Sequence, residues 1–485
     1  MTSATAPSNS IVSLDAVSLS RAIHRREVSC VEVLEAFLVQ IDQQNPTVNA
    51  IVAMPEPDAL FAQARERDAQ LDRKQSMGVL HGFPQAPKDI APVAGMITTN
   101  GSPIFKGQVT TTDSAANARV RAAGAIFVGR TNSPEFGLGA HTYNPVYGIT
   151  RNAFDPSRCA GGSSGGAGVA LALNMLPVAD GSDMMGSLRT PAAFNNVFGF
   201  RTSPGCVPHG PGEEVFFQQF SVTGPMARNI PDLALLLSVQ AGFDARLPLS
   251  RRQDDVKLFE QPLERELRGT RIGWLGDLGG HLPIEAGLLG ITETALEHFK
   301  TIGCTVQAAQ PNFDLEQLWN AWLTLRSFTF AGGNAHHYYS ASSRALLKPE
   351  AVWEIERGLA LSGPDVFAAA KVRTAWYQEL RRLFEQFDFL VMPAAQVSPF
   401  AAEEHWPKQV AGKTMDTYHR WMQSVIPATM AGLPTLAAPA GFTSSGLPVG
   451  LQIIGPVQND MSVLQLGHAY DLASGYSKIR SKLLR

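Results

Sequence analysis

The chain has 485 residues, of which 45% are hydrophobic and 17% are charged, and its 40 Lys and Arg against 43 Asp and Glu give a formal net charge of −3. These values describe a globular protein with one large domain or a few ordinary ones. Because a near-zero net charge provides no basic footprint, we expect neither nucleic acid nor an anionic membrane as a partner.

The cysteines and the first residues bear on the cellular compartment. The chain has four cysteines, far apart in sequence: Cys30, Cys159, Cys206 and Cys304. They form no C-x-x-C pair, so we expect no metal site and a reducing compartment. The first ten residues lack the basic-then-apolar pattern of a signal peptide, and the apolar stretch over 165–179 is too short for a membrane span. The sequence therefore favours a cytoplasmic enzyme.

The first predicted elements are helices. Residues 29–41 begin with Ser29 and Glu32 in the spacing of a capping box, and apolar residues follow at helical spacing. A second helix is predicted over 58–73, and a third from Asp113, as its N-cap, to Gly124. The apolar residues 125–128 then predict a short buried strand, and a helix that leads into a strand is half of an α/β repeat.

The same alternation continues along the chain. The pattern predicts helices over 166–173, 188–196 and 293–302, and strands over 176–179, 270–275, 387–392 and 451–454. We find no internal repeat, no low-complexity tract and no Pro/Gly/Ser linker. These observations favour a single large α/β domain over residues 1–485.

The densest chemical signal is the run Gly-Gly-Ser-Ser-Gly-Gly at 161–166. An isolated run of this composition is usually a flexible linker. Here it passes directly into a helical pattern, which places Ser163 and Ser164 at a helix N-terminus with unpaired N–H groups.

A second serine lies 24 residues after Ser163. Ser187 is part of a segment over 180–192 that follows an apolar strand and precedes a helix that Pro191 could help to start. In a tight strand-to-helix turn a serine can act as a nucleophile, and the N–H groups that converge there can form an oxyanion hole. An N-cap serine is the plainer interpretation.

A third element places Lys88 at the end of an apolar run between prolines, over 82–90. Burial disfavours the charged form of a lysine, lowers its pKa and allows it to act as a general base. The alternative is a solvated surface charge.

In their order and spacing, these three elements resemble the amidase signature family. Residues 45–50, 129–137 and 446–455 also look like that family. The resemblance covers nearly the whole chain and is most specific over 80–205, the expected catalytic core; residues 206–400 would be a variable, substrate-shaping region. It implies a mixed, twisted β-sheet covered on both faces by helices.

The resemblance also implies a chemistry. It assigns Ser187 as the nucleophile, Ser163 as the bridging serine after a cis Gly162–Ser163 peptide bond, and Lys88 as the base, with no cofactor. The oxyanion would be bound by backbone N–H groups of four residues: Met184, Met185, Gly186 and Ser187. The turn would be supported by Ser164, Asp183 and Arg189. The implied activity is hydrolysis of a small-molecule carboxylic amide, or of an ester or carbamate, through an acyl-enzyme on Ser187.

The chain departs from the family at the nucleophile turn. Many relatives have Thr-Gly-Gly-Ser where this chain has Met184-Met185-Gly186-Ser187. The side chain of Met185 restricts backbone angles that glycine leaves open and brings a flexible thioether towards the reacting centre. A relative's substrate therefore cannot be transferred to this chain.

Two apolar concentrations bear on the substrate. They comprise Val215, Phe216, Phe217 and Phe220, and Leu318, Trp319, Trp322, Leu325, Phe328 and Phe330. At spacings of three and four such residues are more often core than pocket. If some line the site, an aryl or alkyl acyl group is favoured. The run over 336–339, His-His-Tyr-Tyr, could form a polar pocket edge.

Three other interpretations stay open. Residues 161–165 also match the G-x-S-x-G motif of α/β-hydrolases, which requires an apolar strand directly before it, whereas 152–159 resemble a loop. Within the family, the chain could be the amidase component of a glutamine-dependent transamidation complex, which needs partner subunits. It could also be a non-catalytic relative that binds an amide. A homodimer is a family expectation.

Overall fold

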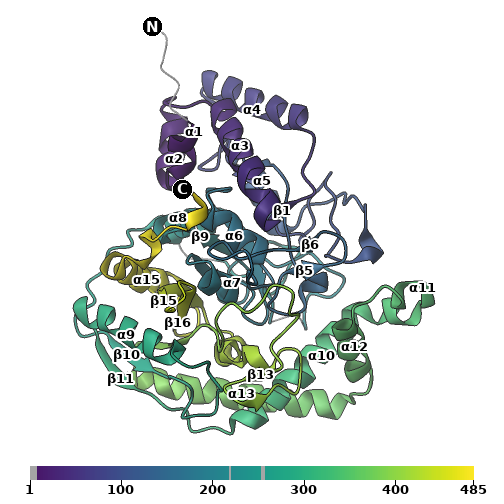
Figure 1. Ribbon diagram of the computed structural model, residues 1–485, viewed down its shortest axis with the longest axis vertical. Coiled ribbons are helices and arrows are strands. Elements are labelled where there is room, and N and C mark those ends of the chain that lie inside the picture. The colour runs from purple at the N-terminus through teal and green to yellow at the C-terminus, as the bar shows by residue number, and fades with distance from the viewer. Residues whose placement is uncertain (1–7, 218–219, 253–256, 485) are drawn as a thin grey trace.

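An eight-stranded mixed sheet forms the centre of the computed structural model, which describes residues 8–217, 220–252 and 257–484 (Figure 1). The strand order is β11-β10-β12-β16-β15-β8-β9-β7. Strand β10 pairs in parallel with β11 and β12, and the other neighbours are antiparallel. The strands are β7 (Ala179–Asp183), β8 (Phe198–Arg201), β9 (Val222–Ala227), β10 (Arg271–Trp274), β11 (Thr305–Ala308), β12 (Phe389–Pro393), β15 (Thr435–Phe442) and β16 (Pro448–Ile454).

Helices cover both faces of this sheet. On one face Leu436, Ala438 and Ile453 pack in a cluster with residues of α8 (Ile230–Gln240), α9 (Leu288–Thr301) and α15 (Asp460–Ser474). On the other, α7 (Arg189–Phe194) lies so close to β16 that a Cβ at Gly450 would be 2.6 Å from the Cβ of Ala193. The predicted α/β fold with a mixed sheet covered by helices is confirmed.

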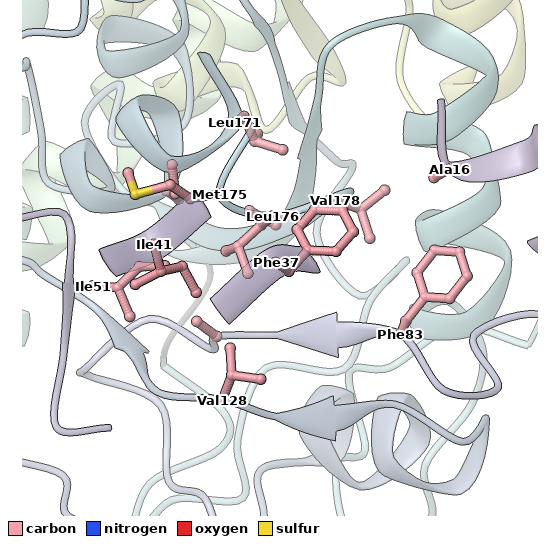
Figure 2. Packing of buried hydrophobic residues seen from close by; sticks show 14 of the residues in the cluster. Ala16, Phe37, Ile41, Ile51, Phe83, Val128, Leu171, Met175, Leu176 and Val178 are labelled. Atoms are coloured by element: carbon pink, nitrogen blue, oxygen red, sulfur yellow. The ribbon is translucent and has the colours of Figure 1, made fainter. Parts of the chain in front are cut away.

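The N-terminal helices pack beside α6 (Gly165–Ala172). They are α1 (Ser8–Ser13), α2 (Ala16–His24), α3 (Cys30–Val48), α4 (Pro57–Asp72) and α5 (Ala115–Ala122). Phe37 and Ile41 of α3 belong to the same buried cluster as Leu171 of α6 and Met175 (Figure 2). The predicted capping box of Ser29 and Glu32 is present at the start of α3. This core holds α6 in place, and α6 in turn presents the Gly/Ser run.

The remaining elements are long helices towards the C-terminal half and short strand pairs. The helices are α10 (Leu315–Tyr339), α11 (Ala341–Arg344), α12 (Pro349–Leu359), α13 (Gly363–Gln386) and α14 (Ile426–Ala431). The pairs are β1 (Ile51–Val52) with β4 (Arg130–Thr131), β2 (Pro84–Gln85) with β3 (Ile126–Phe127), β5 (Tyr143–Asn144) with β6 (Gly148–Ile149), and β13 (Gln409–Val410) with β14 (Lys413–Thr414). Short 3₁₀-helices cover Pro103–Phe105, Glu135–Gly137, Leu258–Glu260, Arg420–Val425, Tyr476–Lys478 and Lys482–Leu484.

Several predicted boundaries were wrong: α3 continues to Val48, α9 begins at Leu288, β16 begins at Pro448, and two further differences have a clear local cause. The N-cap of α5 is Ser114, whose side chain accepts from the Asn117 N–H, whereas Asp113 binds Arg121. The strand expected over 176–179 is β7, which runs from Ala179 to Asp183 because it pairs with β9 along its whole length. Within the described ranges, no helix combines the length and apolar character needed to cross a membrane.

Candidate active site

Ser187 lies in a tight turn between the end of β7 and the start of α7, as the sequence predicts. The turn depends on Gly186, whose φ is 80° and whose added Cβ would lie 2.8 Å from Val425. The positive φ falls at Gly186 and not at Met185, so the methionine found in place of the family's glycine is compatible with the backbone. Ser187 itself is 7% exposed.

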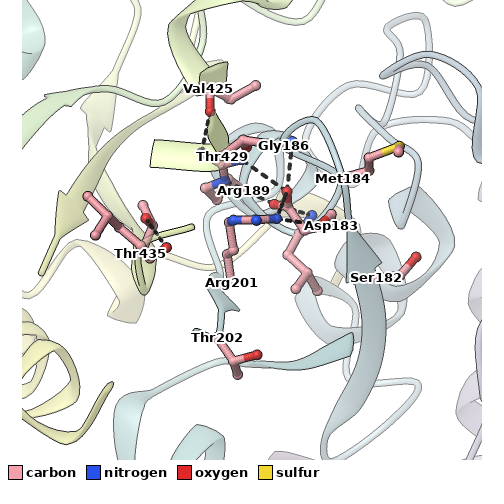
Figure 3. Close-up of polar contacts among 12 residues, drawn as sticks. Ser182, Asp183, Met184, Gly186, Arg189, Arg201, Thr202, Val425, Thr429 and Thr435 are labelled. Carbon is pink, nitrogen blue, oxygen red and sulfur yellow. Dashed lines mark hydrogen bonds and ion pairs between the residues drawn. The ribbon is translucent and has the colours of Figure 1, made fainter. Parts of the chain in front are cut away.

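The carboxylate of Asp183 stabilises this turn (Figure 3). This carboxylate accepts from the Leu188 N–H at 3.2 Å and forms a bidentate ion pair with Arg189, at 2.9 Å for both contacts. Arg201 Nη1 lies 3.3 Å from the same carboxylate. Burial alone would raise the pKa of Asp183, but the two guanidinium groups hold it well below its ordinary value. Asp183 is therefore a permanent anion that fixes the turn.

The geometry changes the expected set of oxyanion donors. The Gly186 N–H donates to Asp183 Oδ1 at 2.9 Å, so it is directed to the support of the turn. The predicted contribution of Gly186 to an oxyanion hole therefore does not fit this structure. The backbone N–H groups of Met184, Met185 and Ser187 stay candidates, because the turn carries all three residues to the pocket described below.

The Gly/Ser run lies against the turn that carries Ser187. The Gly162–Ser163 peptide bond is cis, as the family resemblance implies. The Ser164 N–H donates to the Ser187 carbonyl at 3.1 Å, and the Ser164 hydroxyl donates to the Ser182 carbonyl at 3.5 Å. These contacts bring Ser163 and Ser187 into the same pocket.

Lys88 is buried beside the two serines. Its Nζ donates to Ser163 Oγ at 2.7 Å and to Ser182 Oγ at 3.2 Å, and the residue is 1% exposed. Burial lowers the pKa of Lys88 to about 7, although Asp183 and Asp180 act in the opposite direction. A lysine with this pKa is neutral in about half of the molecules at pH 7 and can accept a proton.

The backbone of Lys88 is fixed by the buried Arg130. Arg130 donates from Nη2 to the Lys88 carbonyl at 2.7 Å and from Nε to the Pro87 carbonyl at 3.0 Å. Lys88 also forms an isolated parallel bridge with Thr131. The side chain of Lys88 therefore extends from a rigid backbone.

A small pocket of about 100 Å³ opens at the serines. Its apolar walls come from Ile90, Phe136, Leu138, Met184, Met185, Phe330 and Met422, and its polar groups from Ser163, Ser182, Ser187, Ser221 and Arg326. A larger cavity of about 370 Å³ adjoins it and is lined by Lys88, Asp180, Ser182 and His209, among others. Ile90, Ser182 and Ser221 line both cavities, and Lys88 lines the larger one.

The aromatic concentrations divide between core and pocket. Trp319, Trp322, Leu318, Leu325 and Phe220 are buried in one cluster. Phe330 lines the pocket, whereas Phe216 and Phe217 are exposed.

None of residues 336–339 lines the small pocket, but His337 packs against one of its wall residues. His337 packs against Phe136 with ring centroids 6.0 Å apart, and Phe136 packs against Phe330 at the same separation. Tyr339 is exposed.

Sequence reasoning missed three residues of this site. Ser182 is the second hydrogen-bond partner of Lys88, Arg201 is the second cation on Asp183, and Arg326 lines the pocket. Ser182 stands in the motif itself, where a polar residue between Gly181 and Asp183 was the available signal. Arg201 and Arg326 reach the site only through the tertiary fold.

The structure also bears on the α/β-hydrolase and metal interpretations. Residues 152–159, before the Gly/Ser run, contain isolated bridges at Arg158 and Cys159 but no named strand, contrary to what a nucleophile elbow requires. Among the residues with described positions, no group of three or more His, Cys, Asp or Glu could hold a metal ion.

Comparison with known proteins gives a consistent result. The family model for Amidase matches residues 32–464. A glutamyl-tRNA(Gln) amidotransferase subunit from Thermosynechococcus vestitus is 32% identical over 96% of this chain and 99% of that protein. An acylamidase from Rhodococcus erythropolis is 31% identical over 93% of this chain and 94% of that protein.

Solved structures agree in fold. A bacterial aryl acylamidase of the amidase signature family superposes with a TM-score of 0.89, at 28% identity, over 96% of this chain and 98% of that one. A peptide amidase from Stenotrophomonas maltophilia has a TM-score of 0.80, at 26% identity, over 96% and 97% of the two chains. The chain belongs to the amidase signature family of amidohydrolases.

Proposed function

We propose that this chain hydrolyses small carboxylic amides with an aryl or alkyl acyl group, through an acyl-enzyme on Ser187, without a cofactor. The observation that carries the proposal is the 2.7 Å hydrogen bond from a fully buried Lys88 to Ser163, in the pocket that also contains Ser187. Apolar side chains of Phe136, Leu138 and others form the walls of that pocket, which favours an apolar acyl group.

These positions support the following mechanism. Neutral Lys88 takes a proton from Ser163 while Ser163 takes one from Ser187, and the Ser187 oxygen attacks the amide carbonyl. Backbone N–H groups of the turn, from Met184, Met185 and Ser187, bind the oxyanion. Ser163 returns the proton to the leaving amine, and water then releases the acid by the reverse relay.

Active-site labelling tests the assignment. A fluorophosphonate should modify Ser187, and the Lys88→Ala variant should suppress that labelling. The Ser187→Ala variant should have no amidase activity. A label on Ser163 or Ser164, or full turnover by Ser187→Ala, would overturn the proposal.

A second candidate is the amidase component of a transamidation complex. It is favoured by the 32% identity to the glutamyl-tRNA(Gln) amidotransferase protein over nearly the whole length of both chains. The purified chain alone distinguishes the two functions. Turnover of simple amides by the isolated chain supports the first, whereas turnover that requires added partner subunits supports the second.

A further inference from the structure

The small pocket at Ser187 has a cationic side chain in its lining, that of Arg326. Arg326 lies on α10 and is 4% exposed, yet it contributes to the pocket lining next to Met184, Met185 and Ser187. The catalytic relay described above does not use it. A charged residue in so small and apolar a pocket needs an explanation, because burying a guanidinium costs free energy unless it is paired.

Two of the three guanidinium nitrogens of Arg326 donate hydrogen bonds to buried side chains. Nε donates to Glu354 Oε1 at 2.5 Å, and Nη2 donates to the Tyr418 hydroxyl at 2.9 Å. Glu354 is fully buried and also accepts from Ser327 Oγ at 2.7 Å and from the Tyr418 hydroxyl at 2.8 Å. The carboxylate therefore neutralises Arg326 and fixes the plane of its guanidinium group.

The third nitrogen has a different environment. Arg326 Nη1 donates to Met184 Sδ at 3.5 Å, and Met184 is the pocket residue that stands immediately before Met185 in the nucleophile turn. A thioether sulfur is a weak acceptor on a flexible side chain. A stronger oxygen acceptor that enters the pocket can therefore displace it at small cost, and hydrogen bonds to charged groups are the strong ones.

From this arrangement we infer that Arg326 is a substrate-binding residue whose Nη1 selects amides with a neutral hydrogen-bond acceptor, such as a second carbonyl, in the acyl group. The inference rests on the proposed amidase function and specifies its substrate class. The acceptor is neutral because Glu354 already compensates the charge of Arg326, so a carboxylate would lose its hydration for little Coulombic gain.

A matched set of primary amides tests the inference. N,N-dimethylsuccinamide carries a second, neutral carbonyl. In 5-methylhexanamide the tertiary amide is replaced by hydrocarbon of the same chain length and terminal branching, and succinamate carries a carboxylate. Ammonia release gives kcat/KM for each. We expect the first compound to exceed the second by about ten- to a hundredfold, which is the usual range for a hydrogen bond to a charged group. Succinamate should fall below the first; a preference for succinamate would overturn the neutral-acceptor assignment.

Variants of Arg326 distinguish its contribution to the substrate ratio from differences in the intrinsic reactivity of the three amides. In Arg326→Lys the ratio between the first two substrates should fall towards one. If that variant does not fold, Arg326→Met combined with Glu354→Gln removes the buried pair together. Arg381→Lys, at an exposed arginine paired with Glu385 on α13, is the matched control and should keep the wild-type ratio. An unchanged ratio in a folded Arg326 variant would refute the inference.

Binding to the Ser187→Ala chain keeps the two proposals distinguishable. Calorimetric dissociation constants for the same three compounds report on Arg326 without any turnover. If they show the expected ratio while the wild type hydrolyses none of the amides, the proposed function fails and the Arg326 site stands. If the wild type hydrolyses all three amides at equal kcat/KM and binds them equally, only the Arg326 inference fails.

Discussion

Replacement of Lys88 by methionine should stabilise the protein near neutral pH while it abolishes activity. Folded Lys88 loses its proton near pH 7 because it is buried, whereas in the unfolded chain it does so near 10.5. Between these values the unfolded state holds a proton that the folded state lacks, so folding stability rises with pH. Relative to a neutral side chain, Lys88 costs about 4 kcal/mol at pH 7 and about 2 kcal/mol at pH 9.

The variant also loses two hydrogen bonds, those to Ser163 and Ser182, which are worth about 1 kcal/mol each. Lys88→Met should therefore be more stable than the wild type by about 2 kcal/mol at pH 7 and about equal to it at pH 9. The stability difference between variant and wild type therefore falls by about 2 kcal/mol from pH 7 to pH 9, and this fall does not depend on the hydrogen bonds.

Urea unfolding of both proteins at pH 7, 8 and 9 measures this difference. The control is Lys300→Met, at a lysine that is 52% exposed and paired with Glu297, for which the difference from wild type should not change over the same range. A Lys88→Met difference that stays constant between pH 7 and 9 would refute the claim that Lys88 is buried in its neutral form.

Three further predictions concern the same site. Lys88 must be neutral to act as a base, so kcat/KM for an uncharged amide should fall about tenfold per pH unit below pH 7. Steady-state rates between pH 5 and 9 measure this dependence, and a flat profile down to pH 5.5 would contradict it. Ser182→Ala removes one of the two hydrogen-bond acceptors of Lys88 and should lower kcat about fivefold with little change in KM. Ser163→Ala should lower kcat far more. Equal losses of kcat in the two variants would count against the roles assigned to these serines. Asp183→Asn leaves two buried arginines without their anion and should lower the free energy of unfolding, measured in urea, by about 3–5 kcal/mol. The control, Asp388→Asn, lies in an exposed pair with Arg271 and should change this free energy little. Similar values for both variants would show that the buried network does not stabilise the turn.

The elements that sequence periodicity predicted well are those with local signals. The α3 helix has a capping box and apolar residues at helical spacing, so its start at Cys30 follows from Ser29 and Glu32 alone. Strand β15 had no such signal, because it contains Pro439 and Gly441, which argue against a strand interior. The sheet accommodates them with a shift in register between these two residues.

The site residues also differ in whether they have a local sequence signal. Lys88, Ser163 and Ser187 stand in motifs whose order and spacing identify the family, so the sequence could suggest them together. Arg201 and Arg326 have no local pattern, since each acts on a residue, Asp183 or Met184, that the fold brings to it. Strand β7 illustrates the intermediate case: its Gly181-Ser182-Asp183 end resembles a turn in sequence, but antiparallel pairing with β9 keeps it extended.

The site assigns opposite electrostatic states to two groups of similar burial. Asp183 is fully buried and charged because Arg189 and Arg201 compensate it, whereas Lys88 is equally buried but donates to two hydroxyl groups, which do not compensate a charge. Desolvation acts on both, and the type of partner decides whether it is overcome. Near neutral pH the carboxylate can therefore serve as a fixed, charged anchor for the turn that carries Ser187, while the pKa of Lys88 falls where a proton can be exchanged. A carboxylate in place of either hydroxyl would remove this difference, because it would hold Lys88 in the charged form that cannot accept a proton from Ser163.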